Sequence, residues 1–249
     1  MTESCLVRSL SVLPFRLFCL LLGLLALPSS AADKPTVAVL YFGYSGENPE
    51  MKVLRKGLAQ MLITDLSGFG TVKLVERDRL QEILDELQMG QSDKFDSATV
   101  AKIGKLVGAH YLVMGSYFDL MNTLVVDAKV VKVEKGTILG SRRSTGTPEE
   151  FLAIEQKLAQ EVNQVLEGIT SASPEKPQSP TPEPTGAPGS PSPSRKARKL
   201  PTRIALRYSR ALDAKDRKDV ETAKKELAEV IKEQPDFVLA STDLASLMK

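Results

Sequence analysis

The sequence predicts an α/β fold, a mixed sheet covered by helices, followed by a disordered Pro-rich linker and a small all-α tail. Strand-like apolar runs alternate with helical stripes in the first half, and three strand-like runs then follow with no helix between them. Prolines crowd a later stretch, and helical stripes resume after it. The predicted order before the prolines is βαβααβββα, which suits helices packed on a sheet.

The first predicted strand covers residues 36–42, an apolar run rich in β-branched and aromatic side chains. A polar loop over 43–49 leads to a helix over 50–67, which ends at Gly68 and Gly70. The apolar stripe of this helix comprises Leu54, Leu58, Met61, Leu62 and Leu66. The charged residues that lie off the stripe are Arg55, Lys56 and Asp65.

A short strand over 72–75 comes next, and two helices follow it. Asp78 is predicted to cap the first helix, and Asp96 with Ser97 opens the second. The residues expected to face inward are Leu80, Ile83, Leu84 and Leu87 in the first helix, and Val100, Ile103, Leu106 and Val107 in the second.

Three consecutive strands, over 111–118, 124–133 and 137–144, are predicted to form an antiparallel meander because short turn-forming stretches join them. In the middle strand, Asp127 and Lys129 alternate with apolar residues, so one face is solvated and the other packed. Strands of about ten residues are long enough for an outer-membrane hairpin. The charged side chains leave no continuous lipid-facing band, which favours a solvated sheet.

The last helix of this half has a clear start. Thr147 and Glu150 have the spacing of a capping box, and Pro148 stands at the first helical position. The apolar stripe that follows comprises Phe151, Ile154, Leu158, Val162 and Val165.

Residues 1–32 are predicted to be a secretory signal peptide. Two arginines precede an uncharged apolar run over 17–27, which is followed by Pro28 and small residues. The run is too short to cross a bilayer, which takes about 20 apolar residues. We expect cleavage after Ala31 or Ala32. The exported chain would then lie in the periplasm, the space that the outer membrane encloses, either free or in association with that membrane.

Both cysteines of the chain, Cys5 and Cys19, lie in the predicted signal peptide. The exported chain would then have no disulfide, no thiolate nucleophile and no cysteine-based metal site. A lipoprotein needs a cysteine just after the apolar run, whereas Cys19 lies within it. We therefore predict that the exported chain carries no lipid anchor.

We divide the exported chain into an α/β domain over 33–170, a Pro-rich linker over 171–200 and a helical tail over 201–249. The linker is expected to be extended and solvated, because proline fixes φ and the segment has little apolar surface to bury. The small-residue spacing of the tail resembles one tetratricopeptide unit plus a capping helix. Such arrays need about three units, so we expect the tail to complete its folding on a partner or on another copy of itself.

Three segments of the first domain together resemble the CsgG family of curli production assembly/transport components, and the related amino-terminal domain of TolB. They are the strand and helix over 37–66, the run Leu74–Leu84, and Gly108–Tyr117. The resemblance covers about 35–168. It implies a role in building surface structures such as curli or flagella at the periplasmic side of the envelope.

From this resemblance we expect a non-enzymatic accessory factor that acts by protein–protein contact with envelope proteins and forms a homo-oligomer. Two alternatives stay open. One is a subunit of an outer-membrane secretion ring, from which the chain departs in lacking a lipid-accepting cysteine and in having tight hairpin turns. The other is a TolB-like module that binds an envelope polymer or ligand.

The candidate partner-contact residues are charged. One group is Glu76, Arg77 and Arg79, for which the competing interpretation is a solvated helix start with locally paired arginines. The second group belongs to a basic run over 195–218, and comprises Arg195, Lys196, Arg198, Lys199, Arg203 and Arg207. In an envelope its expected partners are anionic lipids or acidic polymers. Nucleic acid is not expected, because the chain is exported.

No catalytic, cofactor or metal site is predicted. His110 is the one histidine in the chain, so neither a Cys/His pair nor a His-rich metal site can be assembled. We expect His110 to be a surface or hydrogen-bonded residue. The glycines at 43 and 46 follow a strand but lack the Gly-Lys-Ser/Thr of a phosphate loop. With 33 bases and 31 acids, the charge balance also disfavours a polyanion-binding protein.

Overall fold

The computed structural model describes residues 34–89, 96–171 and 200–249. These residues belong to one compact unit, from Lys34 to Lys249. The predicted signal peptide and almost all of the predicted Pro-rich linker lie outside the described residues.

The sheet is mixed, as the sequence predicts. Its strands are β1 (Thr36–Val39), β2 (Gly43–Tyr44), β3 (Lys73–Leu74), β4 (Tyr111–Leu120), β5 (Thr123–Lys132) and β6 (Thr137–Gly146). The spatial order is β3-β1-β4-β5-β6, with β2 also pairing with β4. β1 runs parallel to both of its neighbours, and β4, β5 and β6 form the predicted antiparallel meander.

β2 lies where the sequence predicts a polar loop. After β1 the chain leaves the ladder and pairs again with β4 at Gly43↔Ser116 and Tyr44↔Tyr117. A two-residue strand leaves no periodic pattern to detect. The Tyr44 and Tyr117 rings pack together with centroids 5.2 Å apart.

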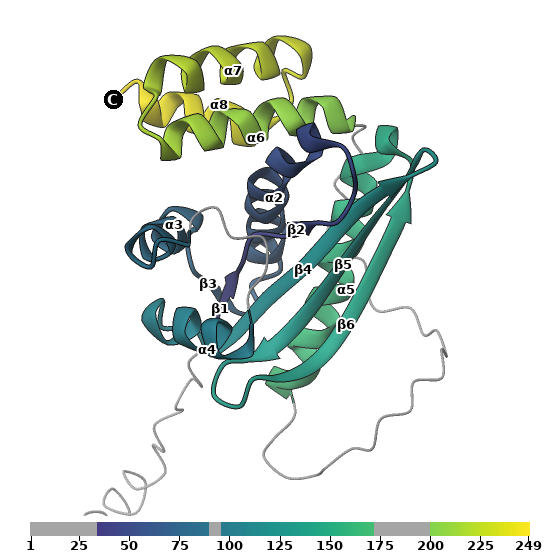
Figure 1. Ribbon diagram of the computed structural model, residues 1–249, viewed down its shortest axis with the longest axis vertical. Helices are drawn as coiled ribbons and strands as arrows, with labels where there is room; N and C mark the ends of the chain where they lie inside the picture. Colours follow the sequence, from purple (N-terminus) through teal and green to yellow (C-terminus); the bar gives the residue numbers. More distant parts are fainter. Residues whose placement is uncertain (1–33, 90–95, 172–199) are drawn as a thin grey trace, which may run out of the picture. The chain divides into compact units, whose positions relative to one another are not determined.

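Helices cover the sheet in the predicted order. They are η2 (Pro49–Val53), α2 (Leu54–Phe69), α3 (Arg77–Glu86), α4 (Ser97–Leu106), η3 (Pro148–Glu150) and α5 (Phe151–Ser171), followed by the tail helices α6 (Thr202–Asp216), α7 (Val220–Glu233) and α8 (Val238–Leu247). α5 runs behind β5 and β6 and also packs against α2 (Figure 1). The core lies between these helices and the sheet.

Alternation along β5 confirms the predicted solvated and packed faces. Val126, Ala128 and Val130 are buried, whereas Lys129 is exposed. α5 can approach β6 closely because β6 presents Gly140 and Gly146 to it, where a Cβ would meet side chains of α5 at under 3 Å.

The predicted helix ends are confirmed in three places and wrong in two. Gly68, which was predicted to end α2 together with Gly70, lies inside that helix, which runs to Phe69. Gly70 ends α2 with a left-handed φ of 67°, Asp96 accepts from the Thr99 amide to cap α4, and Thr147 and Glu150 form the capping box. α3, however, begins at Arg77 with Glu76 at the N-cap position. Asp78 therefore lies inside the first turn and caps nothing.

The prediction of burial is also wrong for one residue of α4. Leu106, expected to face inward, is 45% exposed. It is the last residue of α4, where the helix turns away from the sheet into the Val107–Gly108 corner that precedes β4.

The turn between β4 and β5 has an unusual sequence for its conformation. Met121 and Asn122 have φ of 47° and 60°, as a two-residue type I′ turn requires, and such turns favour Asn-Gly. The double substitution Met121→Asn, Asn122→Gly is expected to raise the free energy of unfolding by about 1 kcal/mol, because asparagine and glycine adopt the left-handed backbone conformation of these two positions at a lower cost. Urea denaturation measures this.

The turn between β5 and β6 provides a control of opposite sign. Gly136 has a φ of 63° with no neighbouring atom in the way of a side chain, so Gly136→Ala should lower stability through the backbone alone. Equal midpoints for the two turn variants would contradict this account.

Candidate binding site between the helical tail and the α/β domain

The helical tail packs against its own α/β domain. α6 lies across α2, and the two helices meet at Gly57, where a Cβ would come within 2.0 Å of the Ser209 hydroxyl. The buried tail residues join the hydrophobic core of the α/β domain as one cluster, among them Ile204 and Tyr208. The tail therefore has an intramolecular partner, whereas the sequence suggested a partner protein or a second copy.

Buried ion pairs hold this contact together. We call Lys56, Arg77, Asp213 and Asp216 the tail ion-pair cluster. The Asp216 carboxylate lies 2.8 Å from Arg77 Nη1 and 2.8 Å from Lys56 Nζ, and Asp213 lies 2.8 Å from the same ammonium. Arg77 is 2% exposed and Lys56 is 5% exposed. Two buried cations of the domain thus meet two carboxylates of α6, of which Asp216 is buried and Asp213 is partly exposed.

The Asp78 carboxylate, 2.5 Å from Arg77 Nη2, and two neutral side chains complete the surroundings of Arg77. The Tyr41 hydroxyl accepts from Arg77 Nη1 at 3.2 Å and donates to Gln81 Oε1 at 2.7 Å. Burial raises the pKa of Tyr41 well above its ordinary value, so the phenol stays protonated and able to donate. Its ring also lies near the charged ends of Arg55 and Lys56.

The first group of candidate contact residues is divided by the fold. Arg77 is buried in the tail ion-pair cluster, which corrects the interpretation of a solvated arginine at a helix start. Glu76 is exposed at the start of α3. Arg79 is exposed and pairs with Glu82 at 2.9 Å. Only Glu76 and Arg79 of this group lie at the surface, where their contact with a partner stays a prediction.

The second group lies partly outside the described residues, namely Arg195, Lys196, Arg198 and Lys199. Arg203 pairs with Glu233, and Arg207 lies 3.6–3.9 Å from Glu226, Glu229 and Glu233. All of these acids belong to α7, so Arg203 and Arg207 join α6 to α7. Their predicted contact with lipid or polymer would compete with these pairs.

Acid is expected to loosen the tail. Burial alone would raise the pKa of Asp78, but hydrogen bonding to Lys215 and the charges of Arg77 and Lys215 outweigh it and lower the pKa. A carboxylate with a lowered pKa in the folded chain stabilises above its unfolded pKa, and this stabilisation is lost as pH falls through the folded value. Hydrogen bonds from Thr99 and Thr222 likewise lower the pKa of Asp96 and Asp219.

The expected result is a urea midpoint that holds steady from pH 7 to about pH 5 and falls below about pH 4. Asp78→Asn should make the acid side of this profile shallower, because it removes one of the three carboxylates described above whose pKa is lowered. An unchanged profile in the variant would show that the Lys215–Asp78 contact, 2.9 Å long, contributes nothing.

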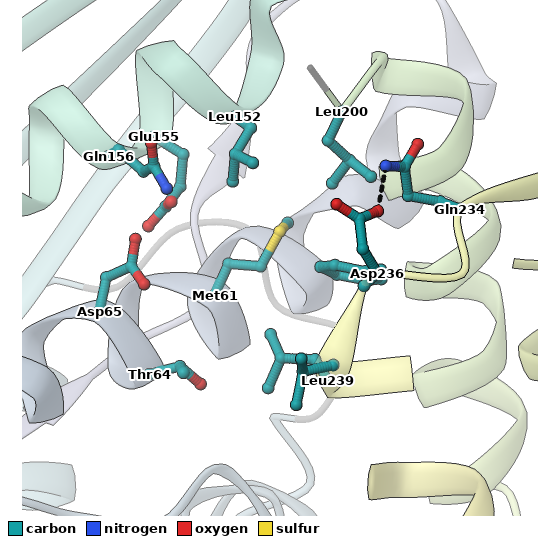
Figure 2. Close-up of a pocket in the computed structure, with 12 residues that line it drawn as sticks. Met61, Thr64, Asp65, Leu152, Glu155, Gln156, Leu200, Gln234, Asp236 and Leu239 are labelled. Atoms are coloured by element: carbon teal, nitrogen blue, oxygen red, sulfur yellow. Dashed lines mark hydrogen bonds between the residues drawn. The ribbon is translucent and has the colours of Figure 1, made fainter. Parts of the chain in front are cut away.

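Beside this contact lies a cleft, which we call the junction cleft. It has a volume of about 100 Å³ and lies between α2, α5 and the tail (Figure 2). Its apolar lining comprises Met61, Leu152, Leu200, Phe237, Val238 and Leu239, and its polar lining comprises Thr64, Asp65, Glu155, Gln156, Gln234 and Asp236.

Three segments distant in sequence build the junction cleft. Two come from the helices of the α/β domain. The third is the tail, through the connection between α7 and α8 and the first residues of α8. Leu200 joins them, although it was predicted to end the solvated linker, and it is buried at 1% exposure. Thr202 fixes the entry of the tail, because its hydroxyl donates to the Pro148 carbonyl at 2.6 Å. Gln234 donates to the Asp236 carboxylate at the edge of the cleft (Figure 2).

The size of the junction cleft limits its chemistry. Cofactor and small-molecule pockets commonly measure about 300–1,000 Å³, so the cleft is too small to enclose a nucleotide or flavin. A cavity of about 150 Å³ holds a benzene ring, so the cleft suits a single side chain. Among the described residues no group of three or more histidines, cysteines and acids is arranged to hold a metal ion.

The sequence did not predict the junction cleft. Some of its residues, such as Met61, belong to helical stripes that predict only a core, and others, such as Asp65 and Leu200, lie outside the stripes; none belongs to a motif. His110, by contrast, is exposed as expected, and its Nδ1 accepts the Thr36 amide at 3.1 Å. None of the helices within 34–89, 96–171 and 200–249 combines the length and the apolar composition of a membrane span.

Residues 22–121 match a family model described as curli production assembly/transport component CsgG. The match ends within the turn between β4 and β5, so it covers less of the chain than the resemblance suggested. No curated protein sequence gives a match.

Several solved structures are similar to part of this chain at low sequence identity. The LpoB C-terminal domain from Salmonella enterica is 17% identical with a TM-score of 0.40, over 48% of this chain and 87% of that one. The PelC dodecamer from Paraburkholderia phytofirmans is 15% identical with a TM-score of 0.33, over 54% and 88%. TolB from Acinetobacter baumannii is 14% identical with a TM-score of 0.36, over 55% and 30%.

Proposed function

Because the chain carries a CsgG-like domain, we propose that it is a non-enzymatic accessory factor for assembly or transport in the periplasm of the cell envelope. It acts by contact with other envelope proteins. The match of residues 22–121 to a curli assembly/transport component is the observation that carries this proposal. The signal peptide predicted over residues 1–32 supports it, because it would deliver the chain to that compartment.

The tail adds contact surface to the domain. Buried ion pairs and a shared core join α6 to α2, so a partner would meet the α/β domain and the tail as one surface. Exposed Glu76 and Arg79 and the basic run over 195–218 are proposed contact residues on it. Rim charges of this kind favour rapid and selective association more than tight binding.

Cell fractionation with crosslinking tests the proposal. The full chain, expressed with a C-terminal tag, should appear in the periplasmic fraction without its first 32 or so residues, because the signal peptide is removed. Crosslinking should capture envelope proteins together with it. The matched control is residues 33–249 with the same tag, which should stay in the cytosol and capture none of them. Finding the unprocessed full chain in the cytosol would refute the proposal.

The alternative of a secretion-ring subunit rests on the same family description, which includes transport. Size analysis of detergent extracts of the membrane fraction separates the two. A large ring in the extract would favour the secretion subunit, whereas a small homo-oligomer in the periplasmic fraction would favour the accessory factor. Tight binding of purified peptidoglycan fragments would instead favour the TolB-like alternative.

A further inference from the structure

We propose that one end of the α/β domain binds the surface of an anionic membrane. The surface, which we call the basic apolar patch, comprises Lys102, Lys105 and Leu106 of α4, Lys129 of β5, and Ile138 and Leu139 of β6. Its aliphatic side chains enter the headgroup region of the bilayer, and its lysines contact lipid phosphates. This goes beyond the proposed function, because it names a surface for lipid and not for a partner protein.

Strand pairing brings α4 and β6 to the same face of the sheet. A Cβ on Gly104 of α4 would lie 2.5 Å from Val133 and 3.3 Å from Leu112, so α4 packs over these two residues. Leu112 pairs with Val131, and Val131 pairs with Ile138. Because directly paired residues share a face, Ile138 lies on the side of the sheet that α4 covers, at the end where β5 turns into β6 (Figure 1).

Three aliphatic side chains of the patch are exposed to water. Leu106 is 45% exposed, Ile138 is 56% exposed and Leu139 is 40% exposed. Leu139 has no pairing partner in β5, because the register shifts between Val130 and Val131 and leaves it out of the ladder. Single exposed aliphatic residues are common on protein surfaces, whereas several at one end of a sheet mark an interaction surface.

The lysines of the patch lie beside these apolar side chains. Lys102 and Lys105 share the outward side of α4 with Leu106, since residues three and four apart lie on one side of a helix. Lys129 is two residues from Val131 along β5 and therefore lies on the same face of the sheet as the rest of the patch. Each of these lysines is exposed.

The positive charge of the patch is not neutralised by neighbouring acids. None of its three lysines pairs with an acid within the described residues. The acids next to them along the chain already have basic partners, since Glu134 lies 3.3 Å from Lys132, and Asp127 lies 2.6 Å from Arg143. An anionic surface is therefore the complementary partner.

The composition of the patch favours a bilayer over a protein as this partner. Protein interfaces are enriched in aromatic residues and depleted of lysine, whereas the patch has three lysines and no aromatic residue. Lysine suits a membrane surface, because its long stem extends along apolar neighbours while its ammonium reaches the lipid phosphates.

Co-sedimentation of the purified chain over 33–249 with lipid vesicles tests the proposal. The chain should bind vesicles of equal parts phosphatidylglycerol and phosphatidylcholine, should bind them more weakly as the salt concentration rises, and should not bind phosphatidylcholine alone. The double substitution Lys102→Gln, Lys105→Gln should lower the partition coefficient about tenfold or more, because each lysine near an anionic surface contributes about fivefold.

Two control variants remove the same charge elsewhere. Lys225→Gln, Lys232→Gln changes exposed residues of α7 and should leave binding unchanged. Arg198→Gln, Lys199→Gln changes the basic run over 195–218, which is itself a predicted lipid contact. Equal weakening by the α4 and α7 variants would overturn the proposal. Loss of binding in the basic-run variant, with none in the α4 variant, would also overturn it and assign the lipid contact to the basic run.

Tryptophan fluorescence locates the contact, because the chain has no tryptophan of its own. Ile138→Trp should emit at shorter wavelength when the anionic vesicles are added. Met121→Trp is the matched control, since Met121 is 92% exposed and lies in the β4–β5 turn, about 30 Å away at the opposite end of β5. Equal shifts at the two positions, or an unshifted Ile138→Trp variant on vesicles that it binds, would refute the assignment of the patch.

Discussion

Replacing Asp216 by alanine is expected to lower the free energy of unfolding by about 3 kcal/mol, the low end for breaking a buried ion pair, because Lys56 and Arg77 lose their buried carboxylate and keep only the more exposed Asp213 and Asp78. The loss falls on two cations at once. Arg77 and Lys56 both lie 2.8 Å from the Asp216 carboxylate, and both are almost completely buried. Chemical denaturation of the chain over 33–249 measures the change.

Asp213 provides the matched control. It lies one turn earlier on α6, it also contacts Lys56, and its side chain is 24% exposed. Asp213→Ala leaves Lys56 its contact with Asp216, so the cost should be about 1 kcal/mol. The double substitution Arg77→Met, Asp216→Leu should recover much of the loss, because apolar replacement of a buried pair is often neutral. Equal costs for Asp216→Ala and Asp213→Ala would contradict the role given to Asp216.

The Asp216→Ala variant should also loosen the contact of the tail with the α/β domain. The junction cleft is built where Leu200 and the connection between α7 and α8 meet α2 and α5. If the tail detaches, the cleft loses one side, and limited proteolysis should cut the tail faster than in the parent chain. Equal rates of cleavage would contradict this account.

Gly115→Ala is expected to destabilise the chain by about 3 kcal/mol, the upper end for overpacking. A Cβ at this position of β4 would lie 1.9 Å from the backbone oxygen of Asp127 and 2.6 Å from the Phe42 ring. The first contact is with the paired strand itself, so relief requires β4 and β5 to move apart. Thermal unfolding measures the change.

Gly68 is the matched control for this substitution. It lies in α2, and a Cβ there would meet no atom within 4 Å. Because glycine in a helix costs about 0.5–1 kcal/mol relative to alanine, Gly68→Ala should raise the melting temperature. Similar melting temperatures for the two alanine variants would show that β4 tolerates a side chain at Gly115.

Much of the fold follows from local pattern. The mixed sheet, the meander over β4, β5 and β6 and the capping box at Thr147 were all predicted, because each depends on residues close together in the chain. Periodicity reports which face of an element is apolar, and that information is local. Elements with a strong pattern were therefore predicted correctly.

The candidate site was not predictable in the same way. Arg55 and Lys56 lie off the apolar stripe of their helix and resemble surface residues, yet both are buried. Lys56 is buried because the acids of α6 satisfy it. No pattern within α2 reveals a helix that lies more than 130 residues further along the chain. Arg77 shows the same limit, since its partner Asp216 also comes from the tail.

The entry point of the tail limits how far the chain can be shortened. Thr202 is held at Pro148, where α5 is about to begin, whereas Ser171, the last described residue before the segment 200–249, ends that helix. A 21-residue helix is about 32 Å long, and an extended chain advances about 3.3 Å per residue. A connection of fewer than about ten residues would therefore pull α6 away from α2. A longer connection changes only the effective concentration of the tail at the α/β domain.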